Sequence, residues 1–131
     1  MTGRLELTPE GLEARLERLA LEVLALTRPL LREADARDFA VQLRRAVTGA
    51  HSNYGAACVA RSHADFTSKI GVALEEADES RRWLRLLKGA GLLSNARVDA
   101  VIREAGELRA ILSASHLTAK ANPEAYKRQG R

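Results

Sequence analysis

Apolar side chains recur at alternating four- and three-residue steps along most of the chain, with polar side chains between them. This spacing places the apolar residues on one face of an α-helix, which has about 3.6 residues per turn. Four such stretches predict helices at about 9–28, 36–61, 63–88 and 95–119, before a flexible basic tail at about 120–131. The second stripe is Phe39, Leu43, Ala46, Ala50, Asn53, Ala57 and Ala60, most of which are small enough for a neighbouring backbone to come close.

The residues between the stripes are typical helix boundaries. Thr8 before a proline and Ser62 three residues before Asp65 are suitable N-caps, because each side chain can accept a free amide of the first turn. Pro29 should end or kink the first helix at about Arg28. We therefore expect a single all-α domain, an antiparallel up-down-up-down four-helix bundle with short connections.

Two of the helices carry more apolar residues than a monomeric bundle needs. These residues lie on flanks that differ from the predicted core stripes, and leaving them in water would be unusual for a soluble monomer. We interpret them as an interface between copies of the chain in a homo-oligomer; the alternative is a wide core stripe with the tryptophan at its margin. The interface candidates are Leu21, Leu24, Leu31, Val72, Trp83 and Leu86.

Composition narrows the class of protein. Aromatic residues make up only 4% of the chain, which argues against an all-β fold. No apolar stretch approaches the roughly 20 residues of a membrane span, and no signal sequence is recognisable at the N-terminus. The single cysteine, Cys58, cannot form an internal disulfide, so we expect a cytoplasmic protein.

The positive charge is concentrated in the second half of the chain. Residues 1–50 hold eight basic and eight acidic side chains, while the whole chain has a net charge of +4. Basic side chains at the end of the third helix and in the tail could neutralise phosphates of RNA or DNA, and Tyr126 could stack on a base. The nucleic-acid-binding candidates are Arg81, Arg82, Arg85, Lys88, Lys120, Tyr126, Lys127 and Arg128.

The sequence offers little for catalysis. A di-metal centre in a bundle needs Glu-x-x-His pairs, and none of the three histidines has a glutamate three residues before it. Cys58 is interpreted as a small core residue. We therefore expect a protein that is not an enzyme and that binds no metal and no cofactor. Asn53 lies in an otherwise apolar stripe, and we expect it to join a structural polar network with Glu76, Glu79 or Arg61 that specifies how helices or subunits pair; a ligand-binding role is the alternative.

Part of the sequence resembles a bacterial family. The run SNYGAACVARS at 52–62, followed by Asp65-Phe66, the acidic run EEADE at 75–79 and Trp83-Leu84, is similar to the four helix bundle protein family, which includes proteins encoded in intervening sequences of 23S ribosomal RNA genes. Diversity-generating retroelement accessory proteins share its fold. The resemblance implies a cytoplasmic ring-like homopentamer without established enzymatic activity, and for the retroelement branch it implies nucleic-acid binding beside a reverse transcriptase.

Two functions therefore remain open at the level of sequence. The first is non-specific binding of RNA or DNA through basic patches, as an accessory to an RNA-processing or retroelement enzyme. The second is an interaction scaffold that presents surfaces to another protein and binds no nucleic acid. A steep loss of affinity for RNA with rising salt would separate the first from the second.

Overall fold

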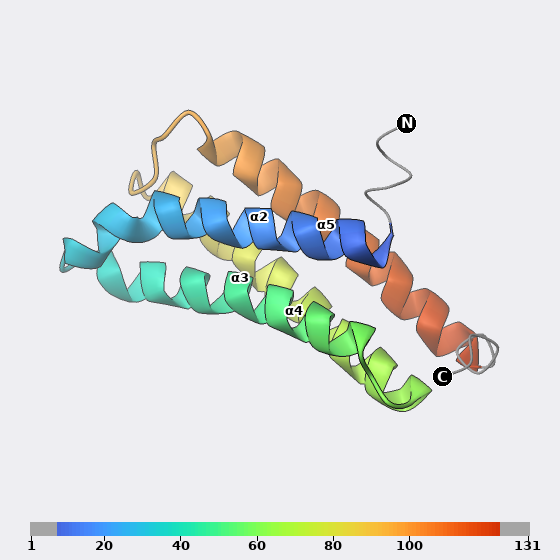
Figure 1. Ribbon diagram of the computed structural model, residues 1–131. Coiled ribbons are helices and arrows are strands. Elements are labelled where there is room, and N and C mark those ends of the chain that lie inside the picture. The colour runs from blue at the N-terminus through green and yellow to red at the C-terminus, as the bar shows by residue number, and fades with distance from the viewer. Residues whose placement is uncertain (1–7, 124–131) are drawn as a thin grey trace.

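The computed structural model describes residues 8–123, and this part of the chain is all-helical and contains no strand. Its four α-helices are α2 (Pro9–Thr27), α3 (Arg37–Cys58), α4 (His63–Gly89) and α5 (Val98–Ala121), and a short 3₁₀ helix, η1 (Arg28–Arg32), follows α2. In Figure 1, α2 and α3 run nearly parallel, and α5 is inclined to both of them. The predicted all-α fold class with four helices is confirmed.

Helix ends follow the predicted signals. Thr8 accepts the Gly11 amide at 3.0 Å at the start of α2, and Ser62 accepts the Asp65 amide at 3.0 Å at the start of α4. Gly91 has φ +76°. The amide of Gly91 donates a hydrogen bond to the Lys88 carbonyl and that of Leu92 to the Leu87 carbonyl, so α4 ends in a Schellman motif. Because Pro29 has no amide proton, α2 ends at Thr27 and the chain continues as η1.

The fourth helix starts later than predicted. The Asn95 side chain accepts the Arg97 amide at 2.7 Å, which holds this segment as a turn, and α5 begins at Val98 instead of near residue 95. The second helix ends at Cys58, three residues before its predicted end.

One continuous cluster of buried side chains draws on all four helices. Helix α3 packs on α2 and α4, and α5 packs on α4 and α2, so all four helices surround this core. Most buried residues of α3 are alanines, which allows the close approach of α4. Within residues 8–123, no helix is long and apolar enough to cross a membrane.

The predicted phase of the α3 stripe was wrong in part. Phe39 is 44% exposed, and Asn53 and Ala60 are only half-buried. The buried face instead runs through Ala40 and Tyr54, because a helix of 3.6 residues per turn drifts away from a strict heptad pattern. The complete buried set of α3 is Ala40, Leu43, Ala46, Val47, Ala50, Tyr54 and Ala57.

Candidate nucleic-acid interface

Of the four basic residues predicted on the third helix, Arg81, Arg85 and Lys88 lie where α4 meets α5, and the more exposed Arg82 joins them through Asp78. A Cβ atom on Gly106 of α5 would lie 3.4 Å from Cδ of Arg81, so this arginine extends across α5 where that helix has no side chain. Lys88 donates a hydrogen bond to Asp99 of α5. The contacts therefore join the predicted basic residues to a second set of charges on α5.

Asp78 is the centre of the first cluster in this surface. Its carboxylate lies 3.2 Å from Arg82 Nε, 3.5 Å from Arg81 Nη2 and 3.7 Å from Arg109 Nε. Within the described residues, the Nε atoms of Arg81 and Arg109 are buried and have no hydrogen-bond partner. One carboxylate is thus shared by three guanidinium groups, which leaves the cluster with two positive charges in excess.

The second cluster lies at the end of α4. A shallow, open depression of about 400 Å³ is lined by Arg85, Lys88, Gly89, Asp99, Ile102 and Arg103. The hydrogen bond from Lys88 lowers the pKa of Asp99, so this carboxyl stays ionised and offsets one cation. Three cations around one carboxylate again leave two positive charges in excess.

These two clusters form what we call the α4–α5 basic face. Its residue types suit phosphate groups, because Arg and Lys bind phosphate oxygens through charge-assisted hydrogen bonds. The Trp83 ring of α4 does not offer a surface on this face for stacking on a base. It packs instead against Phe39 of α3, with centroids 6.0 Å apart. The α4–α5 basic face consists of Arg81, Arg82, Arg85, Lys88, Arg103 and Arg109, with the carboxylates of Asp78 and Asp99.

Sequence reasoning missed the α5 half of this face. Arg103 and Arg109 stand on either side of Gly106, and that arrangement on the flank of the fourth stripe was the available signal. Of the predicted tail residues, Lys120 is exposed in the last turn of α5. Tyr126, Lys127 and Arg128 lie outside the described residues.

The predicted polar network around Asn53 is not formed within the described chain. The Asn53 side-chain amide donates to the Gly49 carbonyl of its own helix at 2.9 Å, and no hydrogen bond or ion pair among residues 8–123 links it to Arg61, Glu76 or Glu79. Glu76 packs against the α3 backbone at Gly49, where burial, followed by the charges of Glu79 and Glu75, raises its pKa. A network between subunits stays a prediction.

The predicted interface residues differ in exposure. Leu21 is 59% exposed and Leu86 is 57% exposed, whereas Trp83 is half-buried against Phe39. Because residues three apart share a helix face, Trp83 and Leu86 form an apolar outer patch with Phe39 on α3 and α4. The remaining candidates, Leu24, Leu31 and Val72, are half-buried.

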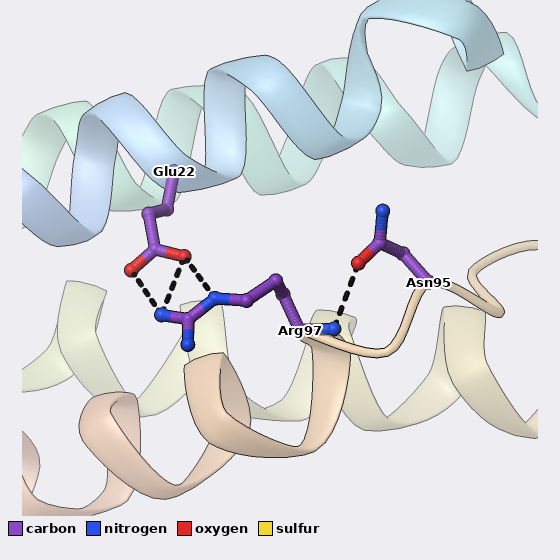
Figure 2. A network of polar contacts seen from close by, with 3 residues as sticks. All are labelled: Glu22, Asn95 and Arg97. Carbon is purple, nitrogen blue, oxygen red and sulfur yellow. Dashed lines mark hydrogen bonds and ion pairs between the residues drawn. The ribbon is translucent and has the colours of Figure 1, made fainter.

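A second charged seam joins α2 to α5, and it was also missed. Arg15 is buried, donates to both carboxylate oxygens of Glu104 at 2.7 and 2.9 Å, and lies 3.1 Å from Glu107. The hydrogen bond to Glu104, the largest contribution, raises the pKa of Arg15. Nearer the start of α5, the Arg97 guanidinium donates to both oxygens of Glu22 at 3.1–3.2 Å, beside the Asn95 turn (Figure 2).

The fold and these surfaces define a small all-helical protein with a cation-rich face on its last two helices. The chain matches the family model described as 23S rRNA-intervening sequence protein over residues 14–114, and it therefore belongs to that family. The predicted resemblance is confirmed.

Among solved structures, the chain is similar to a protein of unknown function from the S23 ribosomal protein family of Bacteroides thetaiotaomicron VPI-5482. The TM-score is 0.75 at 24% identity, and the match covers 82% of this chain and 96% of that one. This likeness shows the same fold. None of the curated proteins matches the chain.

Proposed function

We propose that this protein binds the phosphate backbone of RNA or DNA through the α4–α5 basic face, without sequence specificity and without catalysis. The observation that carries the proposal is the charge balance of that face, where six cations surround two carboxylates. Cations in such excess attract phosphates and release the counterions bound to the nucleic acid, which makes binding salt-sensitive.

Assembly is part of the proposal. An antiparallel order of the four helices is supported by the contacts of α4 with α5, where Gly71 meets His116, Arg81 meets Gly106 and Lys88 meets Asp99. The apolar outer patch, in which Phe39 and Leu86 are exposed and Trp83 is half-buried, supports burial between copies of the chain. A ring-like homopentamer, which the family resemblance implies, would repeat the basic face around the ring and raise avidity without new contacts.

A second function is favoured by the same outer patch. Its aromatic and leucine side chains could bind another protein, such as a reverse transcriptase or an RNA-processing enzyme, in a scaffold that contacts no nucleic acid. Removal of the basic side chains would leave such a scaffold intact.

The decisive experiment is a titration of a structured RNA followed by fluorescence anisotropy at 50 and 200 mM salt. We expect wild-type affinity to fall by roughly 10³-fold if about six phosphates are contacted. The variant R81Q/R82Q/R85Q/K88Q should bind at least about 100-fold more weakly at 50 mM salt. Binding that is unchanged in this variant would exclude the α4–α5 basic face.

The matched control removes four exposed arginines elsewhere, as R18Q/R28Q/R37Q/R45Q, and so lowers the net charge equally. It should keep most of the wild-type affinity, because a general effect of net charge is screened over about 10 Å at 0.1 M salt. Static light scattering tests the assembly, and a monomer at working concentrations would contradict it.

A further inference from the structure

The α4–α5 basic face already holds two anions of its own, and their positions bear on how phosphates bind there. Asp78 lies among Arg81, Arg82 and Arg109, and Asp99 accepts from Lys88 at the rim of the depression that Arg85 and Arg103 also line. Carboxylates and phosphates are recognised by the same guanidinium and ammonium donors. Each carboxylate therefore lies where a phosphate would find its donors.

The Asp78 cluster has more donors than its carboxylate can satisfy. Each guanidinium carries five N–H donors, whereas a carboxylate has about four lone-pair sites. The three ion-pair distances of 3.2–3.7 Å are long, and the buried Nε atoms of Arg81 and Arg109 have no hydrogen-bond partner within residues 8–123. Such an under-satisfied cluster favours a second anion.

Resting on the proposed function, we infer that Asp78 and Asp99 mark two phosphate-binding seats on the α4–α5 basic face and compete there with the phosphodiester backbone of a nucleic acid. Residues 78 and 88 of α4 are ten positions apart, which corresponds to about 15 Å along the helix. Phosphates of one strand are about 3.4 Å apart along the axis of a DNA duplex, so two phosphates a few nucleotides apart can reach the two seats.

The inference predicts that removing either carboxylate strengthens binding. In the wild-type protein, each carboxylate acts as an internal counterion that an arriving phosphate displaces. Binding to the wild-type protein therefore releases fewer salt ions than binding to a variant without that carboxylate. D78N and D99N should each bind a 20-base-pair RNA duplex about two- to fivefold more tightly at 150 mM salt, the range expected from exposed ion pairs. The slope of log K against log salt should steepen by about one in each variant.

Two matched variants separate this effect from a simple gain of positive charge. E22Q removes one carboxylate from an exposed ion pair with Arg97 on the α2–α5 seam, and it should leave both the affinity and the slope close to wild type. D78E keeps a carboxylate among the three arginines and should bind the RNA duplex as tightly as the wild-type protein does. Thermal unfolding by circular dichroism checks that each variant is folded.

The outcomes are distinguishable. Wild-type protein that shows no salt-sensitive binding overturns the proposed function. Wild-type protein that binds, with D78N and D99N no tighter than E22Q, overturns only the two seats. Weaker binding by D78N overturns the Asp78 seat, because it would mean that Asp78 holds its arginines in place for phosphate instead of competing with it, and weaker binding by D99N overturns the Asp99 seat in the same way.

Discussion

The two charged seams of α5 are built from the same residue types and differ in balance and burial. On the α2–α5 seam, two arginines meet three glutamates, and the central Arg15 side chain is only 7% exposed and bonded at 2.7–2.9 Å. On the α4–α5 basic face, six cations share two carboxylates, and the contacts of Asp78 are 3.2–3.7 Å long. The first seam has one negative charge in excess and pairs both of its arginines, whereas on the second the cations outnumber the carboxylates that pair with them.

This difference shows that the role of a charged side chain at a helix seam depends on its burial and on the opposite charges around it. Arg15 has given up most of its hydration, so its carboxylates must stay in place for the fold to be stable. The cations of the α4–α5 basic face remain partly hydrated and contribute little to stability, which leaves them available to an external anion. The predictions below test this division, starting with the largest effect.

Glu104→Gln should destabilise the protein by about 2–3 kcal/mol, because it leaves the buried Arg15 charge with only the more exposed Glu107. Urea denaturation at neutral pH measures the free energy of unfolding. E22Q is the matched control, since its ion pair with Arg97 is exposed and should be worth less than about 1 kcal/mol.

Replacing both partners tests the reason for this loss. The double variant R15M/E104L removes the buried charge together with its carboxylate, and we expect it to be more stable than E104Q alone. A double variant as unstable as E104Q would show that lost packing, and not an unpaired charge, governs the α2–α5 seam.

Arg103→Gln with Arg109→Gln should affect binding and leave stability nearly unchanged. We expect an RNA affinity at least about tenfold lower at 100 mM salt and a salt slope shallower by up to about two, because two phosphate contacts are lost. The free energy of unfolding should change by less than about 0.5 kcal/mol. Arg28→Gln with Arg97→Gln, which removes two arginines outside this face, is the control; equal losses in both double variants would contradict the assignment.

The helices could be predicted from the sequence because their signals are local. Caps at Thr8 and Ser62, the break at Pro29 and the left-handed Gly91 each act within a few residues. The phase of α3 was read correctly only in part, because the pattern does not reveal that Phe39 packs outside the core against Trp83. That contact joins residues 44 positions apart, and only the packing of α3 on α4 brings them together.

The candidate site was predicted in half for the same reason. Four basic residues within about two turns of α4 are visible as a cluster along the chain, but Arg103 and Arg109 join them only through the packing of α5. Along the sequence, Asp78 can pair with Arg81 and Arg82 at three- and four-residue spacing on the same helix. The structure shows that Asp78 is shared with a third arginine from α5, which changes the charge balance of the surface.

The α3–α4 seam should show the smallest effect of the three seams. Its charge imbalance is opposite to that of the α4–α5 basic face, because other acidic side chains surround its carboxylate. Burial, and then Glu79 and Glu75, raise the pKa of Glu76 above the ordinary value of 4.5. The folded protein therefore binds this proton more tightly than the unfolded chain does. The stabilisation is complete below the ordinary value and is lost as the pH rises through the raised pKa, so at pH 7 the charged carboxylate is unfavourable.

Glu76→Gln should accordingly stabilise the protein at pH 7, by less than about 1 kcal/mol because solvent screens a half-buried group. The gain should disappear below about pH 4, where the wild-type carboxyl is protonated as well. Thermal unfolding of both proteins between pH 4 and 8 measures the difference, and Glu33→Gln, at an exposed position after η1, is the control for the loss of one negative charge elsewhere. A gain that is the same at every pH would assign the effect to packing against Gly49, and the α3–α4 seam would then resemble neither of the charged seams of α5.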